Sequence, residues 1–220
     1  ATEEYNNMID YYTVWAHQIK TPIAAMQLSL QSEDTETARK LTSDLNRIEE
    51  YVEMVLTFLR LDSDSTDYLI REYDLDGIIR TSVRKFSREF ILKKLTLDYK
   101  PVNYTVLTDE KWLTFVIEQI ISNAVKYTTE GSVRIYMNEP GILCIEDTGI
   151  GISAEDLPRI FENGYTGFNG REDKRASGIG LYLCKRITEN LGHTISAESQ
   201  PGRGTTIILD FRTTRLVTED

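Results

Sequence analysis

Apolar side chains recur at alternating intervals of three and four residues in two stretches of the N-terminal part. The first stretch contains Tyr12, Trp15, Ile19, Pro22, Met26 and Leu30, and the second contains Leu41, Leu45, Ile48, Val52, Val55 and Leu59. This spacing is typical of a coiled-coil seam and predicts two long helices. A polar break at 31–35 turns them into an antiparallel hairpin. Because one hairpin cannot bury so continuous a seam, we expect two copies to form a four-helix bundle in a homodimer.

The C-terminal part has a different texture. The polar run at 62–67 carries no period and predicts a linker. Beyond it we expect helices from Asp74 to Lys93, from Asp109 to Tyr127 and from Gly180 to Leu191. Alternating segments predict strands at 95–99, 133–137, 142–147, 194–199 and 205–211. The sequence therefore predicts an α+β chain with domains at 1–63 and 64–220.

Charge and cysteine usage exclude several classes of protein. The chain holds 25 Lys and Arg against 35 Asp and Glu, a formal charge of −10. As a whole it repels nucleic acid and anionic lipid headgroups, so we expect no nucleic-acid partner. Cys144 and Cys184 stand in apolar settings without metal-ligand spacing, which predicts reduced core thiols in the cytosol.

No stretch approaches the roughly 18 consecutive apolar residues that a membrane helix needs. The sequence begins with Ala1 rather than methionine. We therefore expect a cytoplasmic domain cut from a longer parent that carries a membrane or sensor part.

His17 lies on the first predicted helix. With Tyr12 and Ile19 at seam positions, His17 falls where a helix faces solvent, which by itself is typical of an ordinary exposed histidine. Pro22 lacks an N–H and strains the carbonyl of Gln18, at a cost of about 3 kcal/mol. A bend so close to His17 indicates that the local geometry matters.

Asp147 ends a predicted apolar strand and is followed by a glycine-rich turn at 148–151. No ordinary phosphate loop is present. A carboxylate at the end of an apolar wall can accept an exocyclic amine while the wall packs a flat ring, although a simple strand-ending turn is the alternative. A dinucleotide fingerprint starting at Gly149 is discounted, because the acidic residue that it requires is not at the end of a second strand.

A long loop at 158–178 carries glycines together with Arg171, Lys174 and Arg175, which predicts a lid over a triphosphate. Gly178 and Gly180 then precede a helix, whose N-terminal amides can bind an anion. A plain turn is an equal alternative for this short motif.

The helix expected from Asp109 carries four polar or aromatic residues on one face. They are Gln119, Asn123, Lys126 and Tyr127. Asn123 offers a neutral oxygen to Mg²⁺, and Lys126 offers a point charge to phosphate. A solvated stripe on an amphipathic helix remains the alternative.

Six segments, taken in order, resemble the H, N, G1, F, G2 and G3 boxes of bacterial sensor histidine kinases of two-component systems. These segments are 16–22, 121–128, 147–152, 160–162, 178–181 and 202–205. The resemblance covers nearly the whole chain. It implies a dimerisation and histidine-phosphotransfer hairpin over 1–63 and a Bergerat-type (GHKL) α/β sandwich that binds ATP over 64–220.

A narrower similarity points to one subgroup of these kinases. Residues 17–22, 167–171, 180–183 and 191–193 are similar to intramembrane-sensing kinases that work with peptide-antibiotic ABC transporters. The resemblance thus implies a parent anchored in the cell membrane, with an ABC transporter as a partner of the missing membrane part.

The resemblance also implies a role for each matching residue. His17 would be the phosphoacceptor, with Gln18 and Thr21 in the same catalytic segment, and Asn123 and Gln119 would hold Mg²⁺. Contacts to ATP would come from Asn123, Lys126, Tyr127, Asp147, Gly149, Gly151, Ile152, Arg171, Lys174, Gly178, Gly180, Leu181 and Thr205. The implied reaction is ATP-dependent autophosphorylation of His17, followed by transfer to an aspartate of a response regulator receiver domain. His193, after Gly192 at a helix end, is interpreted as structural.

The chain departs from the family pattern at Gln18. The family commonly has an acidic residue there, and a neutral amide cannot take a proton, which leaves the kinase rate open. Thr21 keeps the hydroxyl implied in dephosphorylating the response regulator, and Gln119 replaces a frequent second asparagine. Two other functions stay open: a GHKL-type ATPase, and a degenerate pseudokinase that binds nucleotide and presents its hairpin to a partner.

Overall fold

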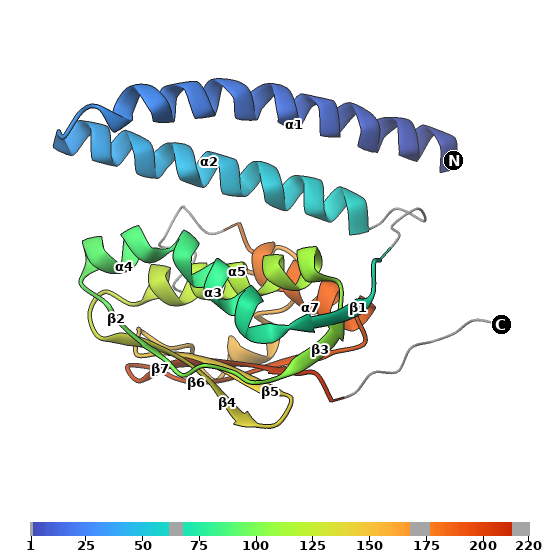
Figure 1. The fold of residues 1–220 in the computed structure, drawn as a ribbon, viewed down its shortest axis with the longest axis vertical. Helices are drawn as coiled ribbons and strands as arrows, with labels where there is room; N and C mark the ends of the chain where they lie inside the picture. The colour runs from blue at the N-terminus through green and yellow to red at the C-terminus, as the bar shows by residue number, and fades with distance from the viewer. Residues whose placement is uncertain (1, 62–67, 168–176, 213–220) are drawn as a thin grey trace. The chain divides into compact units, whose positions relative to one another are not determined.

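The structure is a computed structural model that describes residues 2–61, 68–167 and 177–212 (Figure 1). The chain divides into two compact units, Ala1–Asp67 and Tyr68–Asp220. The domain boundary predicted at 63/64 lies outside the described residues. Across the described ranges, the search for a helix both long and apolar enough to span a bilayer finds none.

The first unit is the predicted antiparallel hairpin of two long helices, α1 (Thr2–Gln31) and α2 (Glu36–Leu61). The hydroxyl of Thr35 accepts the amide of Ala38 at 3.1 Å and so caps the start of α2. Ala16 of α1 packs against Val52 and Leu56 of α2, and its small side chain lets the two helices approach closely.

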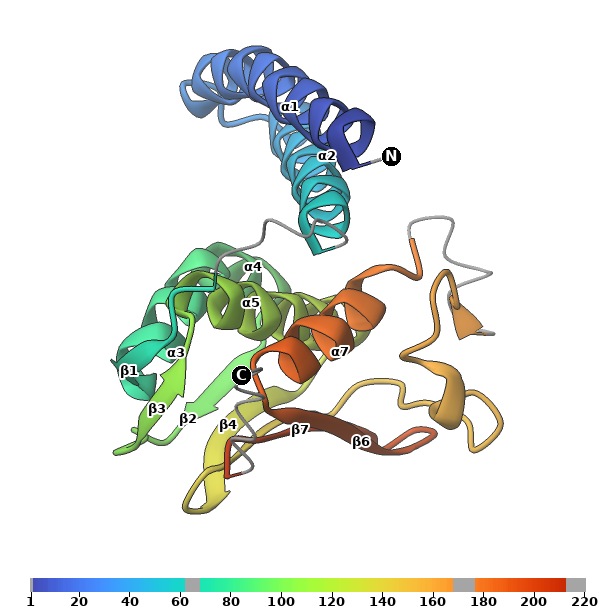
Figure 2. The same ribbon diagram turned by 90° about the vertical axis from the view of Figure 1, so that its right-hand side faces the viewer.

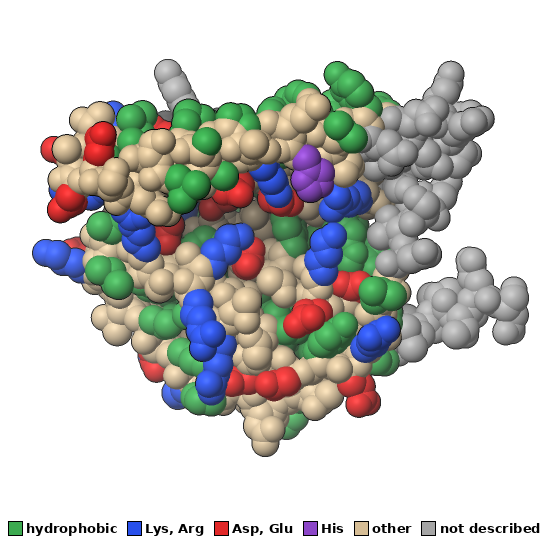
Figure 3. All heavy atoms as spheres, turned by 45° about the horizontal axis from the view of Figure 1, so that its top comes forward, with side chains coloured by type: hydrophobic (Ala, Val, Ile, Leu, Met, Phe, Trp, Pro, Cys, Tyr) green, Lys and Arg blue, Asp and Glu red, His purple; other side chains and the backbone are tan. Residues whose placement is uncertain are grey.

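The predicted seam coincides only in part with the contact face inside the hairpin. On α2, Leu45 and Val52 are buried, whereas Leu41, Ile48 and Val55 are 43–47% exposed. Among the α1 residues whose side chains the structure describes, Ala16 and Ile23 are buried, whereas the seam residues Trp15, Pro22 and Met26 are exposed in the single hairpin. Figure 3 shows hydrophobic side chains exposed along the hairpin. The physical reason is that the apolar stripe is wider than one partner helix covers.

The second unit is built on a mixed sheet with the strand order β2-β4-β5-β7-β6. The strands are β2 (Thr96–Tyr99), β4 (Ser132–Glu139), β5 (Ile142–Asp147), β6 (Thr194–Gln200) and β7 (Gly204–Asp210). Strands β2 and β4 pair in parallel and the other neighbours pair antiparallel. All five strands were predicted.

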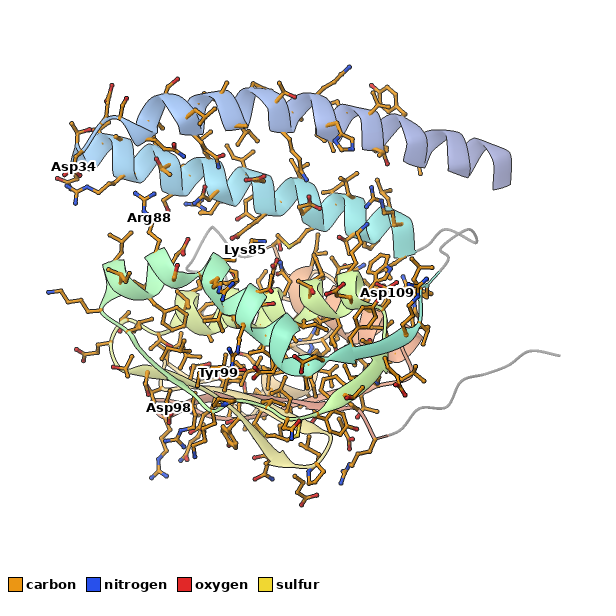
Figure 4. The ribbon with its side chains drawn as sticks, viewed as in Figure 1. Asp34, Lys85, Arg88, Asp98, Tyr99 and Asp109 are labelled. Carbon is orange, nitrogen blue, oxygen red and sulfur yellow. The ribbon has the colours of Figure 1, made fainter. Side chains whose placement is uncertain are left out.

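Helices cover one face of this sheet, as Figure 2 shows. They are α3 (Leu75–Lys85), α4 (Ser87–Lys93), α5 (Glu110–Tyr127) and α7 (Gly180–Asn190), with a short 3₁₀ turn η1 (Leu157–Arg159) in the connection before α7. Ile117 and Ile121 of α5 and Leu143 of β5 have no exposed surface, which places the core between α5 and the sheet. Asp109 caps α5 by accepting the amide of Trp112 at 3.2 Å, as predicted (Figure 4).

In the segment before α5, one prediction was wrong and one small sheet was not predicted. The single helix expected from Asp74 to Lys93 is broken at Phe86, because the chain changes direction there and so buries the rings of both Phe86 and Phe90. Asp74 does cap α3, accepting two amides at 3.2 Å. The sequence pattern also missed a two-stranded sheet of β1 (Arg71–Asp74) and β3 (Thr105–Thr108), since four residues are too few for a clear alternation.

Candidate nucleotide site and phosphoacceptor

Asp147, at the end of β5, is a buried carboxylate of the second unit. Only 9% of its surface is exposed. Its Oδ1 accepts the backbone amides of Gly149 at 2.8 Å and of Thr205 at 3.3 Å. Burial raises the pKa of this carboxyl, and the two amides oppose that shift. Its Oδ2 accepts no hydrogen bond within the described ranges, so one oxygen is left for an incoming donor.

The glycine-rich turn after Asp147 is held against the end of α5. Ile150 donates its amide to the carbonyl of Tyr127 at 3.2 Å. A Cβ on Gly149 would lie 2.4 Å from the same carbonyl oxygen, far inside a normal contact. Glycine at this position therefore allows the turn to lie directly on the last turn of the helix.

The other side of the turn is held by the connection between β6 and β7. Gly202 donates its amide to the carbonyl of Ile150 at 2.7 Å. Gly151 has φ +69°, and a Cβ there would lie 2.1 Å from the carbonyl oxygen of Gln200. The turn is thus fixed between the C-terminal end of α5 and the β6–β7 connection.

A side-chain network joins Ile152 and Thr205 to this cluster. Ile152 donates its amide to the hydroxyl of Ser199 at 2.8 Å, and that hydroxyl lies 2.9 Å from the hydroxyl of Thr205. A Cβ on Gly204 would meet the carbonyl oxygen of Asp147 at 1.8 Å. Gly204 lies in the segment 202–205 singled out in the sequence, whereas Ser199 was missed, and only the pairing of Asp147 with Thr205 across β5 and β7 brings it into the site.

The polar face predicted on α5 exists. Gln119, Asn123, Lys126 and Tyr127 are all half-buried, whereas Ile120 and Ile121 between them are fully buried. The Lys126 ammonium lies 4.9 Å from the centre of the Tyr127 ring. Tyr127 reaches the glycine-rich turn through its carbonyl, and the two amide side chains stand on the same helix, one and two turns earlier.

A lysine that sequence reasoning missed holds the end of α5. The Lys93 ammonium, at the end of α4, donates to the carbonyls of Val125 at 2.5 Å, Lys126 at 3.1 Å and Thr128 at 3.2 Å. A cation at a helix C-terminus satisfies carbonyls that lack partners and complements the helix dipole. No linear pattern links the two segments, which are brought together by the fold.

The segment before α7 is held by a glycine pair. Gly164 donates its amide to the carbonyl of Gly178 at 3.0 Å. Gly178 has φ +68°, and a Cβ there would lie 2.5 Å from the carbonyl carbon of Gly164. Gly180 and Leu181 then open α7, whose capping residue Ile179 offers no side-chain cap. Arg171 and Lys174, predicted as lid cations, lie outside the described residues.

On the hairpin, His17 is exposed, as its position on the helix predicted, and so is Gln18. The hydroxyl of Thr21 donates to the carbonyl of His17 at 3.1 Å. Pro22 stands inside α1, which continues through it to Gln31. The accessible imidazole thus sits one residue from Ala16, which is fixed in the hairpin core.

The second histidine, His193, is 2% exposed. Its Nε2 lies 3.3 Å from the hydroxyl of Thr108, and its ring meets the Phe211 ring edge-on at 5.0 Å. Burial lowers the pKa of His193 to about 4. These contacts support the structural interpretation of this residue.

This sheet, its single helical layer and the glycine-rich turns identify an ATPase fold class. Residues 108–215 match the family model of the histidine kinase-, DNA gyrase B- and HSP90-like ATPases. Among solved structures, full-length ShkA in complex with AMPPNP has a TM-score of 0.66 at 22% identity and covers 93% of this chain and 46% of its own. The Acinetobacter baumannii histidine kinase AdeS has a TM-score of 0.58 at 23% identity, and the match covers 90% of this chain and 98% of AdeS. These two likenesses concern the fold.

Sequence comparison identifies the particular family. The chain is 35% identical to the sensor histidine kinase YxdK of Bacillus subtilis, over 93% of this chain and 65% of that protein. It is 37% identical to GraS of Staphylococcus haemolyticus, over 90% of this chain and 59% of GraS. It is 34% identical to BceS of Halalkalibacterium halodurans, over 92% of this chain and 62% of BceS. The chain belongs to the sensor histidine kinases. It spans 59–65% of the length of these relatives.

Proposed function

We propose that this chain transfers the γ-phosphoryl group of ATP to His17 and then passes it to an aspartate of a response regulator. The division of labour would follow residues 1–63, for dimerisation and phosphotransfer, and residues 64–220, for ATP binding. The observation that carries the proposal is Asp147, whose buried carboxylate is oriented through Oδ1 by two backbone amides while Oδ2 stays available.

In this proposal, Asp147 accepts the exocyclic amine of adenine. Gly149 and Gly151 would bring backbone close to the nucleotide, and the amides at the start of α7, which no side chain caps, would face its phosphates. Lys126 adds a positive charge to the phosphates. The lid cations Arg171 and Lys174 complete this set as predictions from the sequence.

Asn123 and Gln119 would hold Mg²⁺. They fit the ion because both carry an uncharged amide oxygen and stand one turn apart on a half-buried helix face, and phosphate oxygens and water would be the further ligands. When bound, Mg²⁺ would neutralise charge on the phosphates.

The chemistry at His17 requires few protein groups. The unprotonated nitrogen of a neutral imidazole attacks the γ-phosphorus, the bond to the bridging oxygen breaks, and ADP leaves with the electron pair. The proton on the other imidazole nitrogen passes to water, because Gln18 can accept a hydrogen bond but not a proton. Phosphoryl transfer depends mainly on positioning and charge neutralisation, so this sequence can proceed without an acidic neighbour.

The partners follow from the same proposal. A second copy of the chain would cover the exposed Ile48 and Val55 in a homodimer. A receiver domain would dock near His17, and Thr21 would position water for its dephosphorylation once its hydroxyl leaves the His17 carbonyl. We place the chain in the cytoplasm, below a membrane-anchored part that works with a peptide-antibiotic ABC transporter.

Incubation with γ-labelled ATP and Mg²⁺ tests the proposal. We expect the wild-type protein to acquire label that is lost in acid and kept in base, and His17→Ala to acquire none while still binding ATP. ATP hydrolysis without labelled protein would instead assign a plain ATPase. Nucleotide binding with neither reaction would favour a pseudokinase, as Gln18 alone suggests.

A further inference from the structure

Positively charged residues of the second unit are concentrated in one short segment. Residues 80–94 contain six Lys or Arg and one Glu, a net charge of +5, so the other 205 residues carry −15 against the total of −10. Charges farther apart than about 8–10 Å are largely screened at physiological salt. A partner that touches this segment therefore meets a basic surface on an acidic protein.

The helix α4 in this segment has two faces of opposite character. Phe86 and Phe90 are buried on the inner side. Ile91 is 76% exposed and Leu92 58% exposed, and both share the outer face with Arg88 at the spacing of one helical turn. Large apolar side chains therefore project into solvent beside a cation.

The cations of the segment fall into two groups. Lys85 pairs with Glu118 at 2.5 Å, Arg80 pairs with Asp76 at 2.6 Å, and Lys93 caps α5. These three serve the fold.

In contrast, the exposed side chains of Arg84, Arg88 and Lys94 form no ion pair within the described ranges. Lys94 has φ 55°, the one positive φ outside glycine among the described residues, so a cation occupies a position that glycine would fill without strain. Figure 4 shows Lys85 and Arg88 pointing away from the sheet.

We propose that this surface, formed by Arg84, Arg88, Ile91, Leu92 and Lys94 and called the α4 patch, docks on an anionic phospholipid bilayer. Apolar side chains on a helix insert about 5–10 Å into the headgroup boundary, while flanking cations attract acidic headgroups. The α4 patch offers both features on one exposed helix face. The inference stands apart from the proposed function, since it uses none of the residues of the nucleotide site.

A bilayer suits this surface better than an acidic protein. Ile91 and Leu92 project rather than line a packed face, and a fluid headgroup layer accepts projecting side chains without a matching pocket. Long cationic side chains likewise need no fixed geometry against laterally mobile lipids. An acidic protein partner is therefore kept as an outcome of the test.

Vesicle sedimentation of the whole 220-residue chain tests the α4 patch. Wild-type protein is expected to bind vesicles of phosphatidylcholine mixed with phosphatidylglycerol, and to bind them less as salt rises. Each basic residue near such a surface strengthens binding about fivefold, so removing two predicts a loss of about 25-fold, and reversing them in Arg84→Glu with Arg88→Glu predicts more. The matched control, Arg71→Glu with Lys111→Glu, has the same charge change at exposed positions and is expected to lose far less.

The apolar contribution is tested separately. Ile91→Ser with Leu92→Ser should weaken binding at high salt as well, because insertion is not screened, and circular dichroism should show an unchanged fold since both side chains are exposed. Equal binding to neutral and anionic vesicles, or equal losses in the Arg84/Arg88 variant and its control, would overturn the proposal. Failure to bind vesicles, together with binding of polyglutamate through Arg84 and Arg88, would overturn it in favour of an acidic protein partner.

Discussion

The two units of this protein treat their apolar residues in opposite ways. In the second unit, Ile117 and Leu143 are fully buried between α5 and the sheet. In the hairpin, Trp15 is 41% exposed and Ile48 46% exposed, although both lie on the predicted seam. The second unit therefore completes its own core, whereas the hairpin leaves apolar surface exposed, which we propose a second copy covers.

The candidate functional groups of the two units differ in the same way, since Asp147 is enclosed and His17 is exposed. Asp147 is fixed by two backbone amides inside a set of close contacts that tolerate only glycine at several positions. His17 is exposed on a helix, with its neighbour Ala16 buried. This contrast fits the proposed function, in which the nucleotide site requires fixed geometry and the phosphoacceptor requires access for an ATP site and then for a receiver domain.

The largest expected effect concerns the exposed stripe of the hairpin. Ile48→Glu with Val55→Glu should convert a dimer into a monomer, because each buried unpaired charge costs several kcal/mol. Light scattering at micromolar concentration gives the mass. Ser43→Glu, at an exposed position off the seam, should leave the dimer intact. A wild-type protein that is already monomeric would show that the exposed stripe of the hairpin does not bind a second copy.

A smaller effect is expected from the close packing around Asp147. Gly204→Ala should destabilise the second unit by about 3 kcal/mol, because the new Cβ would lie 1.8 Å from the Asp147 carbonyl oxygen at φ +106°. Gly202→Ala is the matched control: it has φ +74° but open space, so it should cost roughly 1 kcal/mol. Urea unfolding measures both. Equal losses would mean that the turn relaxes freely.

The stability of the second unit should depend on pH because this unit contains the buried His193. Its pKa is about 4 when folded and 6.5 as the ordinary value, so below pH 6.5 the unfolded chain takes up a proton that the folded chain does not. Stability conferred by the neutral form is therefore lost as pH falls from 6.5 toward 4. From pH 7 to pH 5 the wild type should lose about 2 kcal/mol more than His193→Gln. Parallel pH profiles of the two proteins would contradict this.

The smallest effect is expected at Lys93. Lys93→Met should destabilise the end of α5 by about 1 kcal/mol and weaken ATP binding a few-fold, because the carbonyls that it caps adjoin Tyr127. Calorimetry with ATP and thermal melting check both effects. Lys93→Arg should restore part of each loss, and Lys94→Met should leave ATP binding unchanged. Weakened binding in Lys94→Met alone would refute the role of the cap.

Periodicity and caps predicted much of the fold. The helix after Asp109 and the strand that ends at Asp147 were predicted because a capping aspartate and an apolar alternation are local signals. The break at Phe86 was missed because the gain from burying its ring arises only when α4 packs against the rest of the unit. The sequence did not distinguish the seam residues that face the other helix of the hairpin from those, such as Trp15, that stay exposed, because an apolar stripe does not reveal how many partners cover it.

The candidate site was predictable where one segment carries the chemistry. Asp147 and the glycines after it form one such segment, and the structure brings them together with Thr205. Ser199 and Lys93 could not be predicted, because their contacts join segments 47 and 32 residues apart. Such contacts follow from strand register and helix packing rather than from local sequence.

In the proposed function, the second unit binds ATP and His17 receives its phosphoryl group. Measuring ATP binding and acid-labile label together in the wild type, His17→Ala and Asp147→Asn tests it most directly. We predict label only in the wild type, with ATP binding retained in His17→Ala and reduced at least tenfold in Asp147→Asn. In that variant the amide oxygen would stay with the two backbone amides, and an NH₂ donor would replace the acceptor Oδ2 that faces the adenine amine. Label on His17→Ala, or labelling of Asp147→Asn to the same level as the wild type, would contradict this function.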